Sequence, residues 1–186
     1  MTVIFNKELT YLPYIQSASD KYGVPVALIL AHMKQESAFK PTAYREEPAI
    51  NDGSTGLLQL LLKTAQGMDS SATHEKLLDP AYNIDLGTRY MSQNLKRYGG
   101  NIYDEMASYN AGSVFKNSSG NYTNSVGSLN VQKYVDAVSS NYDDYSKWLA
   151  AGSSEVSVAA VNPILLVTFG VMALAVIFGG ITYARK

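Results

Sequence analysis

Apolar residues recur at helical spacing through most of the first 149 residues of the chain. Pro25 is expected to open one helix, and Asp79 to cap another that has Pro80 at its first position. The spacing predicts six helices in all, over residues 8–22, 25–39, 58–67, 80–98, 102–110 and 131–149. The pattern therefore predicts a mainly α domain.

The first of these helices is expected to carry its apolar residues on one face. That face comprises Leu9, Leu12, Ile15, Ala18 and Tyr22. Pro13 is predicted to fall near the first turn, where a proline costs least. Strand alternation is nearly absent, so residues 42–55 and 112–130 are predicted as polar loops. Long loops in a compact domain often carry function.

The end of the chain has a different pattern. Residues 164–184 form a run of 21 residues without a formal charge, long enough to cross a bilayer as a helix of roughly 32 Å. We predict a domain over residues 1–149, a linker over 150–162, one C-terminal transmembrane helix over 163–184, and a basic tail formed by Arg185 and Lys186. The N-terminus lacks the basic start and the apolar run of a secretory signal.

Composition narrows the function classes. The formal net charge is -1, which argues against a nucleic-acid partner. The chain has no cysteine and two histidines, so we expect no thiolate site, no metal and no cofactor. Its 14 tyrosines combine an apolar face with a polar tip, which suits a wet groove for a sugar polymer.

Glu36 is the carboxylate with the most informative position. It follows the apolar helix ALILAHMKQ, where burial and the helix C-terminus both disfavour an ionised carboxylate. A carboxyl that keeps its proton near neutral pH can act as a general acid. Position alone leaves open the alternative that Glu36 is an exposed residue at a helix end.

Five segments around and after Glu36 resemble a known enzyme family when they are taken in order. They are MKQESAF, GSTGLLQL, LLDPAYNIDLGTRYM, ASYNAG and QKYVDAV. Together they resemble the lytic transglycosylases related to the soluble lytic transglycosylases, and the resemblance covers about residues 10–145. It implies a lysozyme-like helical domain.

The resemblance also implies a set of site residues. Glu36 is similar to the sole catalytic acid/base of the family, and Ser37 to the residue that positions this acid or contacts the substrate. Leu58 stands where the family has a methionine that lines the groove, and Ser108 stands where alanine is commoner. The implied substrate-binding residues are Ser37, Gly56, Leu58, Gln59, Tyr109, Asn110 and Tyr134.

The implied reaction is cleavage of the β-1,4 bond between N-acetylmuramic acid and N-acetylglucosamine in peptidoglycan, with formation of a 1,6-anhydro sugar. A lysozyme-type hydrolase of the same bond is an alternative, because Glu46, Glu47 or Asp52 could supply a second carboxylate. A catalytically silent wall-binding structural protein is another. It is less favoured, because all the expected catalytic positions are filled.

The predicted partners are peptidoglycan glycan strands and a lipid bilayer. The substrate lies outside the cytoplasmic membrane, yet no export signal is visible, so two settings are predicted. The chain resembles virion-associated wall-degrading enzymes of membrane-containing bacteriophages, which are stored on the internal membrane of the virion. The other setting is the bacterial inner membrane, beside secretion-complex proteins, with the enzyme facing the wall.

Overall fold

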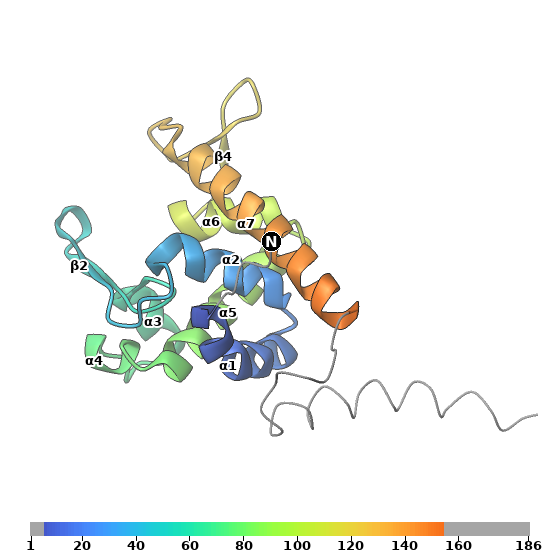
Figure 1. Ribbon diagram of the computed structural model, residues 1–186. Coiled ribbons are helices and arrows are strands. Elements are labelled where there is room, and N and C mark those ends of the chain that lie inside the picture. The colour runs from blue at the N-terminus through green and yellow to red at the C-terminus, as the bar shows by residue number, and fades with distance from the viewer. Residues whose placement is uncertain (1–5, 155–186) are drawn as a thin grey trace, which may run out of the picture. The chain divides into compact units, whose positions relative to one another are not determined.

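The computed structural model describes residues 6–154, and this part of the chain is mainly helical, as predicted (Figure 1). Residues 6–149 lie in one compact unit. The helices are α1 (Asn6–Tyr22), α2 (Val26–Ser37), α3 (Leu62–Met68), α4 (His74–Leu77), α5 (Pro80–Arg97), α6 (Ile102–Ala111) and α7 (Asn130–Ser154).

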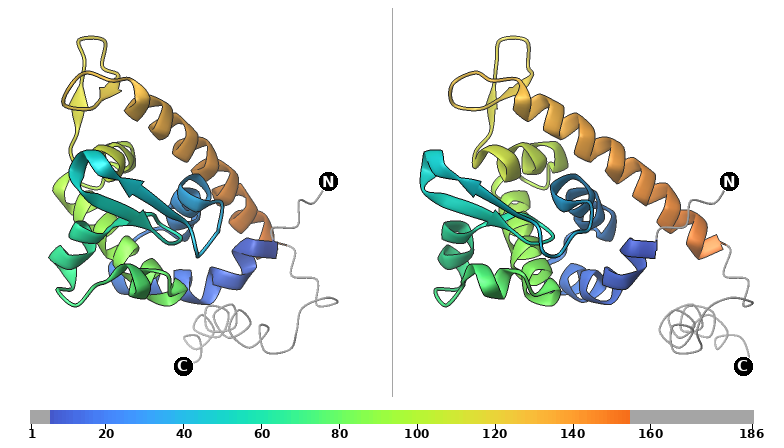
Figure 2. Two further views of the ribbon diagram at one scale, coloured as in Figure 1. Left: turned by 90° about the vertical axis from the view of Figure 1, so that its left-hand side faces the viewer. Right: turned by 60° about the vertical axis from the view of Figure 1, so that its left-hand side comes forward.

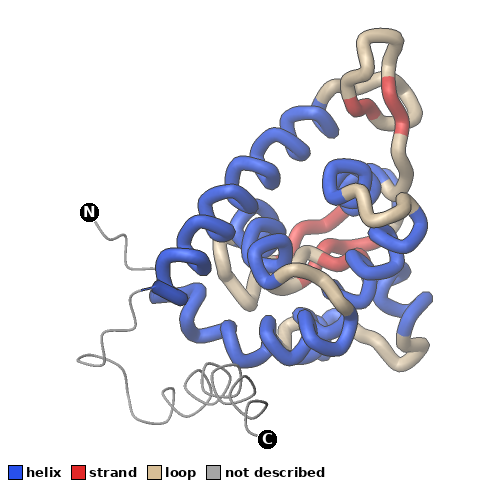
Figure 3. Tube along the Cα trace, turned by 90° about the vertical axis from the view of Figure 1, so that its right-hand side faces the viewer, coloured by secondary structure: helices blue, strands red, loops and turns tan. Residues whose placement is uncertain are grey.

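Two strands replace the first predicted loop, residues 42–55, and a third strand, which lies in the predicted helix over 58–67, completes an antiparallel sheet. Strand β1 (Tyr44–Glu47) pairs with β2 (Asp52–Thr55) across the short 3-10 turn Pro48–Ile50, and β2 pairs with β3 (Leu60–Leu61). The loop prediction was wrong here because strands of two to four residues are too short to show alternation. Figure 3 shows the strands in two places, this sheet and a second hairpin.

The second hairpin interrupts the other predicted loop, residues 112–130. It pairs β4 (Phe115–Lys116) with β5 (Tyr122–Thr123), again too briefly for a sequence signal. The predicted helix over 58–67 is also shorter than expected. It begins only at Leu62, because Gly56 and Gln59 have positive φ angles of 80° and 44° that a right-handed helix does not allow.

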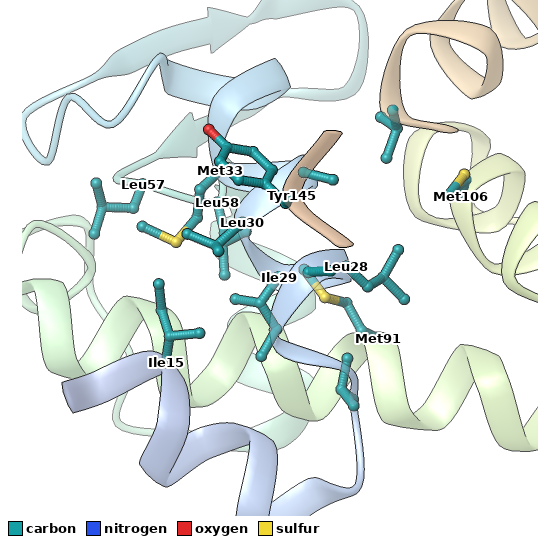
Figure 4. Close-up of a cluster of buried hydrophobic side chains, with 14 of the residues drawn as sticks. Ile15, Leu28, Ile29, Leu30, Met33, Leu57, Leu58, Met91, Met106 and Tyr145 are labelled. Atoms are coloured by element: carbon teal, nitrogen blue, oxygen red, sulfur yellow. The ribbon is translucent and has the colours of Figure 1, made fainter. Parts of the chain in front are cut away.

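Helix α2 lies at the centre of the domain, between the sheet and α7 (Figure 2). Seven consecutive residues of α2, Ala27 to Met33, are buried. Figure 4 shows how side chains from several elements meet around it, among them Ile15, Met91 and Met106. Each fully buried aliphatic side chain of this kind contributes about 1.5–3 kcal/mol.

The first helix differs from the prediction in its buried face. Leu9 is 46% exposed, whereas Glu8, Tyr11, Ile15 and Ala18 are buried. Pro13 lies inside the helix, which is already formed by Asn6, and not near its first turn as predicted. The buried positions at spacings of three and four hold the helix through the proline, because tertiary packing outweighs local propensity.

Two other helix ends bear on the predictions. Asp79 caps α5 as predicted, its side chain accepting a hydrogen bond from the backbone N–H of Tyr82 at 2.8 Å. Helix α7 runs to Ser154, so it includes the first residues of the segment predicted as a linker.

Among the helices of residues 6–154, none has the length and apolarity needed to cross a membrane. The predicted transmembrane helix over 163–184 lies outside the described residues.

Candidate active site

Glu36 occupies the last turn of α2. The helix ends one residue later, at Ser37, because Ala38 adopts the left-handed conformation with φ 49°. The Glu36 side chain is only partly exposed, and its Oε1 accepts a hydrogen bond of 2.5 Å from the Tyr134 hydroxyl. Helices α2 and α7 thus bring together two side chains that lie 98 residues apart in the sequence.

The surroundings of Glu36 favour a protonated carboxyl. Burial raises the pKa of Glu36 above its ordinary value, while the hydrogen bond from Tyr134 and the charges of His32 and Arg45 oppose that rise. The direction agrees with the expectation from its position at the end of an apolar helix. Burial and the neighbouring Glu36 also raise the pKa of the Tyr134 hydroxyl well above its usual value, so this phenol stays protonated.

A tight turn formed by residues 56–59 lies against the end of α2. Gly56 has a φ of 80°, and a Cβ atom at this position would lie 2.3 Å from both the Asn83 Nδ2 atom and the Leu77 carbonyl oxygen. Asn83 is fully buried on α5. It donates to the carbonyls of Thr55 and Leu77 at 2.9 Å, and its Oδ1 accepts from the Leu58 N–H at 2.8 Å. Asn83 therefore fixes the turn.

Three of the predicted substrate-binding side chains bond to the same turn. The hydroxyl of Ser37 donates to the Leu57 carbonyl at 2.8 Å, and the hydroxyl of Tyr109 donates to the Leu58 carbonyl at 2.8 Å. Gln59 Nε2 donates to the carbonyls of Gly56 at 2.9 Å and Ala43 at 3.2 Å. These contacts position the turn beside Glu36, and any contact with substrate stays a prediction.

Leu58 does not line an open surface. Its side chain is 0% exposed and packs against Gly87, where a Cβ atom would lie 2.4 Å from Leu58 Cδ1. The expectation of an apolar groove contact from this side chain is therefore wrong for this structure. A leucine fits the position because the site is part of the close-packed core.

Asn110 is exposed near the end of α6. The cap of that helix is Gly112, with a φ of 73° and an N–H that donates to the Ser108 carbonyl at 2.8 Å. Asn110 follows Tyr109 directly in the sequence, but the Asn110 side chain is exposed whereas that of Tyr109 is partly buried. A substrate-binding role for Asn110 stays a prediction.

The three carboxylates considered as a second catalytic group lie on the sheet. Asp52 caps α3, accepting from the N–H groups of Leu62 and Lys63, each at 3.1 Å. Glu47 pairs with Arg45 at 2.6 Å, and Glu46 is exposed on β1. Asp52 therefore has a structural task that accounts for its position without any catalytic role.

Sequence reasoning missed two side chains behind Tyr134. His32 and Glu105 are both fully buried, and their Nε2 and Oε2 atoms lie 3.0 Å apart. The Nδ1 atom of His32 lies 2.9 Å from the Tyr134 hydroxyl oxygen, and its ring centroid lies 4.5 Å from that of Tyr109. A usable signal was the spacing: His32 precedes Glu36, and Glu105 precedes Tyr109, by one helical turn.

Within the part of the chain that the structure describes, no cluster of three or more His, Cys, Asp or Glu side chains could hold a metal ion. The arrangement provides a partly shielded carboxyl, Glu36, that accepts a hydrogen bond from the phenol of Tyr134. This combination can donate and accept a proton.

Comparison with known proteins agrees with these motifs. The profile of the Transglycosylase SLT domain family matches residues 13–132. Membrane-bound lytic murein transglycosylases C from Serratia proteamaculans and Yersinia enterocolitica are 37% and 38% identical to this chain over 64% and 57% of its length. The matches cover 37% and 33% of those proteins, so the chain spans about a third of the length of these relatives.

Among solved structures, an inactive mutant of the lytic transglycosylase Slt from Pseudomonas aeruginosa has the same fold. It matches with a TM-score of 0.63 and 26% identity over 76% of this chain and 24% of that one. The mainly α, lysozyme-like architecture expected from the sequence is therefore confirmed for the described domain. Because the family profile also covers more than half of its length, this chain belongs to the Transglycosylase SLT domain family.

Proposed function

We propose that this domain cleaves the glycan strands of peptidoglycan as a lytic transglycosylase, with Glu36 as its sole acid/base. The observation that carries the proposal is the geometry of Glu36, a partly shielded carboxyl with a raised pKa whose Oε1 bonds to Tyr134. A carboxyl in this state can donate its proton to a glycosidic oxygen. The names of the relatives and of the matched domain support the same activity.

The proposed reaction needs one carboxyl in two states. Protonated Glu36 gives its proton to the oxygen that joins N-acetylmuramic acid to N-acetylglucosamine, and the bond from C1 to that oxygen breaks. The 6-hydroxyl of the muramyl unit bonds to C1, and the Glu36 carboxylate takes the hydroxyl proton. Glu36 ends protonated, the product is a 1,6-anhydro sugar, and no water is consumed. A correctly held internal hydroxyl competes well with water because of its high effective molarity.

The product distinguishes this reaction from hydrolysis. We expect mass spectrometry of muropeptides released from purified peptidoglycan to show 1,6-anhydro-muramic acid ends, which are lighter by one water than reducing ends. A digestion with a known hydrolase supplies the reducing-end standard. If the released muropeptides carry reducing-end muramic acid alone, the chain is a hydrolase and the transglycosylase proposal is wrong. If nothing is released, the wall-binding alternative gains support.

We also propose that residues 163–184 anchor the domain to a bilayer. The support is the uncharged apolar run in the sequence, together with relatives that are named as membrane-bound. In the full chain, Leu174→Arg combined with Val176→Arg is expected to move the protein from the carbonate-washed membrane fraction to the supernatant. The reason is that each central arginine costs about 2.5–3.5 kcal/mol on insertion scales. Unchanged fractionation would contradict the anchor. Whether the membrane belongs to a virion or to a bacterium stays a prediction.

A further inference from the structure

The hydrogen bond on Glu36 is the outer end of a longer chain of contacts. Glu36 Oε1 bonds to the Tyr134 hydroxyl, that hydroxyl lies 2.9 Å from His32 Nδ1, and His32 Nε2 lies 3.0 Å from Glu105 Oε2. This series of contacts joins three helices, because α2 supplies Glu36 and His32, α7 supplies Tyr134 and α6 supplies Glu105. It leads from the partly exposed carboxyl into the core.

Counting protons along this chain restricts how it can work. The Tyr134 hydroxyl has one proton and faces two possible acceptors, so it donates either to Glu36 or to His32. It donates to Glu36 when His32 carries a proton on Nδ1. In that case a second proton must lie between His32 Nε2 and Glu105. Whether the imidazole or the carboxyl carries this proton, the net charge of the pair is zero.

The opposite arrangement would disable Glu36. If Nδ1 of His32 carried a lone pair, it would attract the Tyr134 proton, and Glu36 Oε1 would have to hold the catalytic proton against the tyrosine oxygen. When the Tyr134 hydroxyl donates its hydrogen bond to Oε1, the catalytic proton of Glu36 sits on the second carboxyl oxygen, from which it can pass to the substrate. Which tautomer His32 adopts therefore decides whether the proton on Glu36 is usable.

Burial indicates that the pair does more than stabilise the fold. His32 and Glu105 are both 0% exposed, and Glu105 Oε1 has no hydrogen-bond partner among residues 6–154. Removing such groups from water is costly, and well-packed apolar residues of similar volume are often at least as stabilising. The position of the pair directly behind Tyr134 gives it a task that apolar residues could not perform.

We propose that the His32–Glu105 pair is a positioning unit that fixes the direction of the Tyr134 hydroxyl, so that this hydroxyl donates its hydrogen bond to Glu36. The inference deepens the proposed function and rests on it for its kinetic consequence. Neither residue of the pair contacts the reacting atoms in this scheme. Both act through Tyr134.

Other titratable or charged groups face this network from the surrounding elements. The charges of Glu36 and Glu105 raise the pKa of Tyr109 on α6, and the charge of Glu105 raises that of Tyr90 on α5. The charge of Arg45 on β1 lowers the pKa of Glu36. Burial, the largest cause, raises the pKa of Tyr90 and of Tyr109, so both remain neutral near pH 7. Of these three groups, only Arg45 carries a charge that the test must hold constant.

The test compares two replacements of Glu105 of similar size. In Glu105→Gln the new amide can still donate an N–H to His32 Nε2, and the Nδ1–H of His32 then donates to the Tyr134 hydroxyl oxygen. Glu105→Met fills the space without any hydrogen bond. We expect the methionine variant to lower kcat by about tenfold on soluble glycan strands, since general acid–base effects are worth about 10²–10⁴-fold in total. The glutamine variant should stay near the unchanged protein.

The pH profile adds a readout that a purely structural role would not move. Donation requires protonated Glu36, so kcat/KM falls as pH rises through its pKa. A weaker hydrogen bond to the carboxylate raises the pKa of Glu36 further, so the alkaline limb of Glu105→Met should move to higher pH. Combined with Tyr134→Phe, the two Glu105 variants should become indistinguishable, because the hydroxyl through which they act is gone.

A second measurement separates this inference from the proposed function. Carbon-13 NMR titration of the Glu36 carboxyl follows the same change without any substrate, so it remains informative even if the protein cleaves nothing. If Glu105→Met does not fold, His32→Leu with Glu105→Met removes both polar partners at similar volume. It leaves Glu36 as the acceptor of the Tyr134 hydroxyl, so the titration of Glu36 should stay near that of the unchanged protein, and a large upward change would contradict the proposal.

The chain offers a matched control in a second buried pair. Tyr145 donates to Glu8 at 2.7 Å, and it lies 11 residues, or about 16 Å of helix, beyond Tyr134 on α7. Glu8→Gln and Glu8→Met should change thermal stability but neither kcat nor the pH profile. Identical profiles for the two Glu105 variants, or an alkaline limb that moves to lower pH in Glu105→Met, would overturn the proposal.

Discussion

Glu36→Gln is expected to lower the rate of peptidoglycan cleavage by about 10⁴-fold, the upper end of what a positioned acid–base group contributes. One carboxyl serves both proton transfers in the proposed reaction, so an amide at this position blocks both. The side-chain oxygen of glutamine still accepts from Tyr134, and the shape of the turn is unchanged. The measurement is the initial rate of muropeptide release, with circular dichroism and thermal melting to establish that the variant is folded.

Asp52→Asn is the matched control for this loss. It makes the same change from carboxylate to amide on one of the three residues, with Glu46 and Glu47, that could supply the second carboxylate of a lysozyme-type mechanism. Asparagine keeps one acceptor oxygen for the N–H of Leu62, but its amide nitrogen cannot accept from the N–H of Lys63, so we expect a loss of stability of about 1–2 kcal/mol and nearly full activity of the folded protein. A Glu36→Gln protein that cleaves at the normal rate would remove Glu36 from the mechanism. An Asp52→Asn protein as inactive as Glu36→Gln would favour the two-carboxylate alternative.

The sequence predicted those parts of the fold that depend on long periodic patterns and on helix ends. The helices around Pro25, Asp79 and residues 131–149 follow from apolar spacing, proline at a first turn and an aspartate cap. The strands were not predictable, since β2 reads DGST and is buried through small polar residues. Its burial depends on pairing with β1 and β3, which no local pattern records.

The same distinction holds for the site. Glu36 and Tyr134 were identified because the motifs that contain them resemble a family, and their contact of 2.5 Å is a property of the fold. His32 and Glu105 were not among the predicted site residues, because their side chains, from α2 and α6, meet only in the folded domain. Leu58 was assigned to the groove by its motif, although its side chain is fully buried.

Gly56→Ala is expected to destabilise the domain by about 3 kcal/mol. A φ of 80° costs an L-residue roughly 1–2 kcal/mol, and overpacking adds about 1–3 kcal/mol. The added methyl group would lie 2.3 Å from Asn83 Nδ2 and from the Leu77 carbonyl oxygen. Backbone cannot move aside as the end of a flexible side chain can, so the turn that supports Glu36 would be displaced. Thermal melting should show a decrease of about 10 °C.

Gly67→Ala provides the control, because Gly67 lies in α3 with nothing within 4 Å of an added Cβ and a φ outside the left-handed region. It should be neutral or stabilise the domain by about 0.5–1 kcal/mol, since alanine has the higher helix propensity. If Gly56→Ala melts at the same temperature as Gly67→Ala, the turn is not held as tightly as its contacts with Asn83 indicate. Activity of the folded fraction of Gly56→Ala should also fall, because the carbonyls that bind Ser37 and Tyr109 belong to the displaced turn.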